Sequence, residues 1–162
     1  MDITFADIEK AQKAIKGQII RTPTVRATRL SLRTGVNIFL KLENLQHTAS
    51  FKARGALNCL LNLDDDQKKR GVVASSAGNH AQGVAFHATR LGIPSTIVMP
   101  KGTAFNKVQR TEEFGAKVIL AGANYDETQG FTHRLAEEEG FTFVHPFYDP
   151  YVIAGQGTLG VE

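Results

Sequence analysis

The clearest indication of fold class comes from residues 72–100, which read VVASSAGNHAQGVAFHATRLGIPSTIVMP. A short apolar run at 72–74 precedes small polar residues, a helix-like segment at 79–91 and a second apolar run at 96–99. Short apolar strands that alternate with helices are typical of parallel sheets with right-handed crossovers. This stretch therefore predicts an α/β fold.

The same alternation continues along the chain. We expect further helices at 104–114 and 125–139 and further strands at 117–120 and 141–144, and a glycine follows each helix as a stop signal. The complete pattern predicts an open, doubly wound parallel sheet. The region before residue 72 is predicted to contain a helix at 6–16, an extended turn around Pro23, a strand at 37–42 and a helix at 51–62 capped by Ser50.

Composition limits the classes of function. A chain of 162 residues that is 42% hydrophobic is long enough to bury a sizeable core. The net charge is +3, but Lys and Arg are scattered and not interleaved with aromatic residues, so we expect no nucleic-acid partner. The acidic run at 64–66 and the basic run at 68–70 are interpreted as solvated, self-neutralising surface.

Cysteine, histidine and hydropathy exclude other classes. Cys59 is the single cysteine, which rules out a disulfide framework and a cysteine-based zinc site. His80 and His87 fall on one predicted helix without a third ligand, so no metal site is expected. The N-terminus is unlike a signal peptide and no apolar run reaches membrane-spanning length, so we expect no membrane association and a cytoplasmic location.

Lys52 is the first candidate for chemistry. Phe51 and Ala53 offer apolar cover and Arg54 is a nearby cation in sequence. Burial and a neighbouring positive charge both lower a lysine pKa, and the neutral amine is the form that attacks an aldehyde. A solvated surface lysine is nevertheless the commoner outcome for such a residue. These residues alone leave both interpretations open.

The run at 75–80 is the second candidate. It falls where a parallel strand is predicted to end and a helix to begin, which is where α/β sheets bind ligands. Free backbone N–H groups and the helix dipole favour an anion there, and small side chains let it approach the backbone. Asn79 either caps the helix or turns its amide towards a phenolic oxygen. The alternative is an ordinary strand-to-helix turn with an asparagine cap.

Three segments together resemble one enzyme family. Residues 41–56, KLENLQHTASFKARGA, look like the lysine motif of the serine/threonine dehydratases, which are fold type II (tryptophan-synthase-β-like) pyridoxal phosphate enzymes. Residues 75–83, SSAGNHAQG, resemble their substrate loop, and residues 149–158, DPYVIAGQGT, resemble the segment after their small domain. The order and spacing match over essentially the whole chain. One departure is Ala49, where a glycine is frequent.

The resemblance implies a role for each matching residue. Lys52 would carry pyridoxal 5'-phosphate through a Schiff base and then act as the base at the substrate Cα. Phe51 would pack beside the cofactor, and Asn79 would hydrogen-bond its ring hydroxyl. The substrate carboxylate would be held by a loop made of Ser76, Ala77, Gly78, Asn79 and His80.

The implied reaction is the dehydration and deamination of L-threonine and L-serine to a 2-oxo acid and ammonia. Serine racemases of the family carry a serine at the place of Ala77, where it acts as acid and base on the opposite face; an alanine cannot transfer a proton, so elimination is favoured. The alternatives are another enzyme of the family (a serine racemase, a hydroxyaspartate dehydratase or a cysteine-synthase-like enzyme) or a non-catalytic fragment with the small-domain fold.

The resemblance also implies a domain division. Residues 1–47 would be the N-terminal part of the large domain, residues 48–148 the small α/β domain, and residues 149–162 the return into the large domain. Family members are longer and form homo-oligomers, and they place the loop for the cofactor phosphate in their later part. We therefore expect this chain alone to bind the cofactor weakly and to turn over little substrate, and to expose apolar residues such as Phe39, Leu40 and Val152.

One motif matches a dinucleotide-binding fingerprint but is not expected to bind a dinucleotide. Residues 155–160, GQGTLG, match the dinucleotide fingerprint G-x-G-x-x-G in every letter. That fingerprint requires a preceding strand, and residues 151–154 are a poor strand after Asp149-Pro150. We interpret these glycines as sites of close helix packing.

Overall fold

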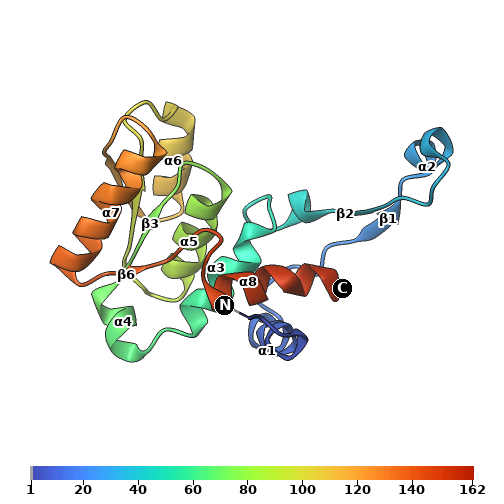
Figure 1. Cartoon of the computed structure of the whole chain (residues 1–162), viewed down its shortest axis with the longest axis horizontal. Coiled ribbons are helices and arrows are strands. Elements are labelled where there is room, and N and C mark those ends of the chain that lie inside the picture. Colours follow the sequence, from blue (N-terminus) through green and yellow to red (C-terminus); the bar gives the residue numbers. More distant parts are fainter. Residues whose placement is uncertain (1) are drawn as a thin grey trace.

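The computed structural model describes residues 2–162, in which a four-stranded parallel sheet forms the centre of an α/β unit (Figure 1). The strand order is β5-β4-β3-β6, and each neighbouring pair is parallel. The strands are β3 (Val72–Ser75), β4 (Ser95–Met99), β5 (Lys117–Leu120) and β6 (Thr142–Phe143).

Helices cover both faces of this sheet. The helices of the unit are α5 (Asn79–Arg90), α6 (Phe105–Glu113) and α7 (Tyr125–Glu139). Val72 and Ala74 belong to a core cluster shared with α5, whereas Val73 belongs to a second cluster shared with α7. Because successive strand residues point to opposite faces, α5 and α7 must lie on opposite sides, as Figure 1 shows. The predicted doubly wound parallel sheet is therefore confirmed.

The direction of winding reverses once. The chain proceeds outward from β3 through β4 to β5, and β6 then returns to the free side of β3. This reversal creates a switch point between β3 and β6, at the carboxyl ends of both strands.

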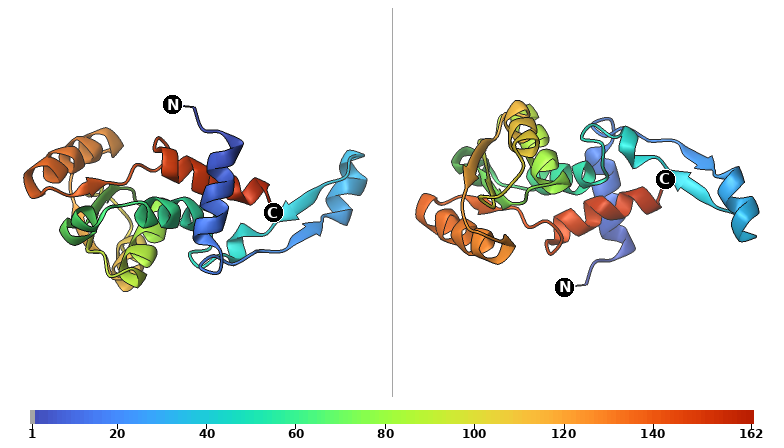
Figure 2. Two further views of the ribbon diagram at one scale, coloured as in Figure 1. Left: turned by 90° about the horizontal axis from the view of Figure 1, so that it is seen from below. Right: turned by 90° about the horizontal axis from the view of Figure 1, so that it is seen from above.

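Three further helices form a layer beside the sheet unit. They are α1 (Phe5–Ile15), α3 (Lys52–Leu61) and α8 (Pro150–Gly157). α3 packs between α5 and α8, and α1 crosses α8 (Figure 2). A Cβ at Gly155 would lie 2.7 Å from the Arg54 carbonyl oxygen, so the two backbones of α3 and α8 approach closely. A Cβ at Gly157 would lie 2.8 Å from Ile8 of α1, whereas one at Gly160 would have nothing within 4 Å. The prediction that these glycines serve helix packing is therefore confirmed for Gly155 and Gly157 and wrong for Gly160.

An arm projects from this layer (Figure 1). It contains the antiparallel strands β1 (Thr24–Arg26) and β2 (Phe39–Lys41), with α2 (Thr28–Thr34) between them and the short 3-10 helix η1 (Glu43–Leu45) after them. The predicted exposure of Phe39 and Leu40 is confirmed, at 60% and 44%. The prediction for Val152 is wrong: its side chain is 0% exposed because α8 packs against α3.

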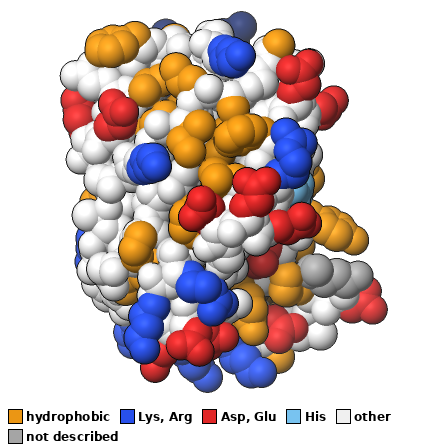
Figure 3. Space-filling view, turned by 90° about the vertical axis from the view of Figure 1, so that its left-hand side faces the viewer, with side chains coloured by type: hydrophobic (Ala, Val, Ile, Leu, Met, Phe, Trp, Pro, Cys, Tyr) orange, Lys and Arg blue, Asp and Glu red, His pale blue; other side chains and the backbone are white. Residues whose placement is uncertain are grey.

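The charged run at 64–70 forms an element that its composition did not predict. Helix α4 (Asp65–Arg70) begins with a capping box, in which the Asp64 side chain accepts from the Gln67 N–H and the Gln67 side chain accepts from the Asp64 N–H. On the face that carries α7, positive and negative side chains are interspersed (Figure 3). Among residues 2–162, no helix combines the length and the apolar character that crossing a membrane requires.

Candidate active site

The switch point brings two loops together. Residues 76–78 follow β3, and residues 144–146 follow β6, the strand beside it. The pairing extends past the end of β6, because the Val144 N–H donates to the Val73 carbonyl over 2.9 Å. Parallel sheets bind ligands at such a point, so these two loops are the expected place for chemistry.

Lys52, the first residue of α3, reaches the loop that follows β6. Its Nζ donates a hydrogen bond of 2.6 Å to the Pro146 carbonyl and lies 5.5 Å from the centroid of the Phe51 ring. The side chain is half-buried, and burial lowers its pKa below the ordinary value for lysine. The helix begins one residue later than expected, although Ser50 Oγ still accepts the Lys52 N–H at 3.4 Å.

Arg54 does not act on Lys52 as the sequence suggested. Its side chain is 0% exposed and forms ion pairs of 2.9 Å with Glu43 and with Glu162. Burial opposes the guanidinium charge, but the hydrogen bonds that Arg54 donates to both carboxylates outweigh burial and raise its pKa. The expectation that Arg54 lowers the Lys52 pKa is wrong, because these partners compensate its charge and burial alone causes the shift.

The partners of Arg54 extend into a buried charge cluster, which consists of Lys41, Glu43, Arg54 and Glu162. Lys41 Nζ lies 2.6 Å from a Glu162 carboxylate oxygen, and the Thr22 hydroxyl donates to Glu43 over 2.6 Å. Burial opposes ionisation of Glu43, but hydrogen bonds from Arg54 and Thr22 hold its pKa below the ordinary value. The cluster therefore ties η1, the first turn of α3 and the segment after α8 to one another.

The loop after β3 has backbone N–H groups that suit an anion. Ser76 Oγ accepts from the Gly78 N–H at 3.3 Å, and Gly78 is the N-cap residue of α5. No described heavy atom outside its chain neighbours lies within 4 Å of the place a Gly78 Cβ would take. The first amides of a helix lack intrahelical partners, so this open end suits a carboxylate or phosphate. Ala77 packs partly buried against the core beside them.

Asn79 is exposed as the first residue of α5. The helix is capped by Gly78 without a side-chain hydrogen bond, so the interpretation of Asn79 as a helix cap is wrong. Its exposed amide is therefore a polar group that the helix end does not use.

His80 is held in one neutral form. Its Nε2 lies 3.0 Å from the Val144 carbonyl, and because a carbonyl only accepts, Nε2 carries the proton. Nδ1 is buried and has no hydrogen-bond partner among residues 2–162. Burial lowers the pKa of His80 to about 4, with a smaller contribution from Lys52. The ring therefore cannot attract a carboxylate through charge, and only the backbone N–H of His80 suits that ligand.

These observations test the fit of pyridoxal phosphate to the site. A half-buried amine with a lowered pKa suits a bond to a carbonyl group, and the Phe51 ring offers an apolar surface next to it. The open helix end after β3 suits the carboxylate of an amino acid. The residues present therefore fit an aldehyde cofactor at Lys52 and an amino-acid substrate at residues 76–80.

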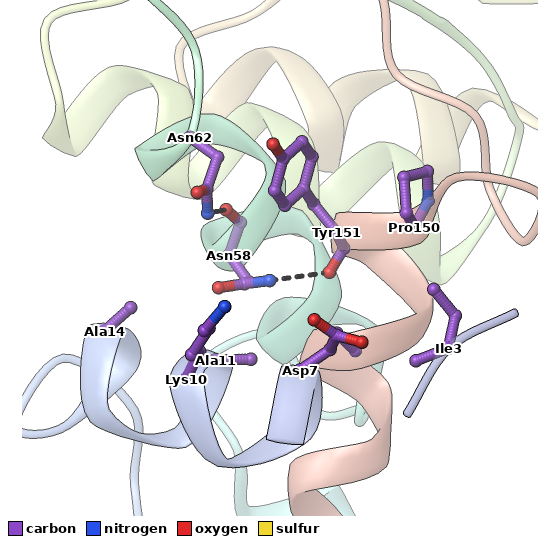
Figure 4. A pocket seen from close by; sticks show the side chains of 10 residues that line it. Ile3, Asp7, Lys10, Ala11, Ala14, Asn58, Asn62, Pro150 and Tyr151 are labelled. Atoms are coloured by element: carbon purple, nitrogen blue, oxygen red, sulfur yellow. Dashed lines mark hydrogen bonds between the residues drawn. The ribbon is translucent and has the colours of Figure 1, made fainter. Parts of the chain in front are cut away.

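A separate pocket of about 450 Å³ lies between α1, α3 and α8 (Figure 4). None of the predicted site residues lines it. Three of its polar side chains already have partners: Asp7 accepts from Thr4, Asn58 donates to the Tyr151 carbonyl, and Asn62 donates to the Asn58 carbonyl. We therefore interpret it as a packing crevice between helices.

Sequence reasoning missed the contribution of β6. Val144 and Pro146 present the carbonyls that hold His80 and Lys52, and burial lowers the pKa of His145 between them. The available signal was the end of the predicted strand at 141–144, since strand ends carry sites in α/β sheets. The sequence does not reveal that β6 lies beside β3. Without that strand order, the end of the strand at 141–144 cannot be linked to the loop after β3.

Comparison with known proteins agrees with this geometry. Residues 15–162 match the family described as pyridoxal-phosphate dependent enzymes. This chain belongs to that family. It is 52% identical over 160 residues to the L-threonine ammonia-lyase of Thermotoga maritima, covering 99% of this chain and 40% of that protein. It is also 52% identical over 161 residues to a catabolic L-threonine dehydratase of Staphylococcus aureus, covering 99% of this chain and 46% of that protein.

Solved structures of the same family share the fold. Maize serine racemase superposes with a TM-score of 0.94 at 35% identity, covering 99% of this chain and 49% of the other. The threonine deaminase isoform 2 of Solanum lycopersicum superposes with a TM-score of 0.88 at 40% identity, covering 96% and 42%. The fold type II assignment is thereby confirmed. The chain spans less than half the length of the two curated relatives described above.

Proposed function

We propose that this family member takes part in the pyridoxal-phosphate-dependent dehydration and deamination of L-threonine, with L-serine as a second substrate, to a 2-oxo acid and ammonia. The observation that carries the proposal is the Lys52 amine, half-buried and lowered in pKa, at the switch point beside residues 76–80. The 52% identity to an L-threonine ammonia-lyase supports the choice of substrate class.

The roles follow the chemistry of each group. When bound, pyridoxal phosphate supplies an electron sink for the charge that develops at the substrate Cα. Lys52 would hold the cofactor, and its amine, once the amino group of the substrate has replaced it there, would take the Cα proton. Phe51 would pack beside the cofactor, and Asn79 would hydrogen-bond its ring hydroxyl. The substrate carboxylate is bound by the backbone amides of the loop that contains Ser76, Ala77, Gly78, Asn79 and His80.

Ala77 favours elimination over racemisation. Racemisation needs a second acid on the face of the Cα opposite Lys52, and a methyl group has no proton to give. A serine racemase is the second candidate, favoured by the TM-score of 0.94 with the maize enzyme. We rank it below the lyase because the side chain at position 77 lacks the required hydroxyl.

Three further expectations, on domain division, assembly and location, accompany this proposal. We propose a domain division at residues 48 and 148, homo-oligomers as the working assembly, and the cytoplasm as the location. The parallel sheet, which falls within residues 72–143, supports the division. No nucleic-acid partner is proposed.

Substrate assays test the function. The chain is supplied with pyridoxal phosphate and, separately, with L-threonine, L-serine, hydroxyaspartate and O-acetylserine plus sulfide. Ammonia, 2-oxo acids and amino-acid chirality are then measured. We expect 2-oxobutyrate and ammonia from L-threonine and no D-serine from L-serine. D-serine without pyruvate would contradict the lyase proposal and support the racemase.

A further inference from the structure

Gly83 lies on α5, one turn after the residues proposed to bind the substrate carboxylate. A Cβ at this position would lie 3.3 Å from the carbonyl carbon and 3.3 Å from the carbonyl oxygen of Lys52, and 3.4 Å from the Ala53 nitrogen. The backbone of Lys52 therefore packs directly against α5. A methyl group added at position 83 would be too close to that backbone.

α3 has little freedom to move away from α5. On the side of α3 that meets α8, a Cβ at Gly55 would lie 2.7 Å from the Val152 carbonyl oxygen, and a Cβ at Gly155 would lie 2.7 Å from the Arg54 carbonyl oxygen. Gln156 Oε1 also accepts the Gly55 N–H over 3.1 Å. The first turn of α3 is thus held between α5 and α8, and packed interiors pass strain to their neighbours.

We infer that Gly83 is a positioning residue, which sets the place of Lys52 relative to residues 76–80. This inference rests on the proposed function, because it assigns Gly83 a purpose only if Lys52 carries the chemistry. A methyl group at position 83 shifts the Lys52 backbone by a few tenths of an ångström sideways between the two helices, since α8 blocks a movement straight away from α5. The shift loosens the contact of Nζ with Pro146 and admits water to the amine.

The expected effect is on reactivity rather than on folding. Water reaching the amine favours its charged form, so a higher pH is needed to obtain the neutral amine. Overpacking by a single methyl group at a contact of this kind lowers the unfolding temperature by only a few degrees.

The test compares Gly83→Ala with Gly130→Ala in the 162-residue chain. Gly130 lies inside α7, and a Cβ there would meet only the Arg134 side chain, at 3.9 Å. Each protein is mixed with pyridoxal phosphate from pH 6 to pH 10 and reduced with borohydride, and the label at Lys52 is measured by mass spectrometry. For Gly83→Ala we expect roughly threefold less label near neutral pH, which is a rise of about half a unit in the midpoint. Gly83→Ser adds the same Cβ and should shift the midpoint in the same direction.

The outcomes separate the two proposals. No label at Lys52 in the unchanged protein overturns the proposed function. Label in the unchanged protein with the same pH midpoint in Gly83→Ala overturns the role of Gly83 alone. An equal shift in Gly130→Ala also overturns it, since the effect would not be specific to the contact with Lys52. Failure of Gly83→Ala to fold overturns it too, because a local displacement predicts a loss of only a few degrees.

Discussion

The amine of Lys52 and the carbonyl of Pro146, which are 94 residues apart in the sequence, form a hydrogen bond of 2.6 Å. The bond joins the start of α3 to the segment that follows β6, across the switch point of the sheet. His80 makes a parallel connection, from the start of α5 to the Val144 carbonyl. Two basic side chains from two helices therefore hold one short segment, so the site depends on the position of β6 as much as on the lysine motif.

Gly155→Ala is expected to destabilise the protein by about 3 kcal/mol. The added methyl group would collide with the Arg54 carbonyl and the Gly55 Cα, which are backbone atoms that cannot rotate away. Differential scanning calorimetry should show a fall of about 6–10 °C in the unfolding temperature. Gly130→Ala on α7 is the control, and it should unfold at the same temperature or slightly higher. A variant at position 155 that melts with the unchanged protein would contradict close packing of α3 on α8.

Arg54→Met is expected to cost about 3–5 kcal/mol, since it leaves the buried Glu43 carboxylate without a cation and Glu162 with Lys41 as its one remaining cation. Urea unfolding at neutral pH measures this loss. The matched control is Arg29→Met on the exposed arm, for which a change within about 0.5 kcal/mol is expected. Equal losses in the free energy of unfolding from the two variants would contradict a stabilising role for the buried charge cluster.

The buried His80 is expected to lower the stability of the folded protein at acid pH. Its pKa of about 4 in the folded protein lies below the ordinary 6.5, so the unfolded chain binds the proton first as the pH falls. The contribution of this group is complete above pH 6.5 and is lost between pH 6.5 and pH 4, by about 2–3 kcal/mol at pH 4.5. His87, with a pKa lowered by burial to about 3, adds a decline over the same range.

His80→Gln isolates the share of His80, because glutamine keeps a donor for the Val144 carbonyl and has no titrating group. Urea unfolding at pH 7 and pH 4.5 gives the difference in the free energy of unfolding for each protein. The variant should lose less stability on acidification than the unchanged protein. Identical losses would show that His80 is already free to take up a proton in the folded state.

Ala49→Gly is expected to stabilise the protein by about 1 kcal/mol. Ala49 has a φ of 54°, which is the left-handed region where a Cβ is strained. Relief of that strain outweighs the extra freedom that a glycine gives the unfolded chain. Thermal unfolding is a sufficient measurement, with Ala14→Gly in the exposed face of α1 as the opposite control. A lower unfolding temperature for Ala49→Gly would contradict strain at this position.

The sequence predicted the elements whose signals are local. The helix over residues 125–139 and the strand over residues 117–120 have the bounds that the pattern indicates, because apolar periodicity and a following glycine define them. Helix α4 was missed because its composition of six charged or polar residues has no apolar face to detect. Its capping box, formed by Asp64 and Gln67, was the signal that identifies it.

The parts that the sequence could not predict depend on contacts between distant segments. Lys52 and residues 76–80 were proposed as site residues from their own motifs, and that assignment stays a prediction. The direction in which Arg54 points was not predicted, since its partners Glu43 and Glu162 come from segments 11 and 108 residues away. Likewise, Pro146 becomes a partner of Lys52 only because β6 returns to the free side of β3.

The most direct test of the central claim, that Lys52 is the lysine that carries the cofactor, is reductive labelling. The 162-residue chain is incubated with pyridoxal phosphate at pH 8, reduced with borohydride and digested, and the labelled peptide is identified by mass spectrometry. The matched control is Lys52→Arg, with Lys41, paired to Glu162, as the internal comparison. We predict label at Lys52 in preference to the other lysines and its loss in the variant. A folded protein labelled equally at exposed lysines, with Lys52 unmodified, would contradict the claim.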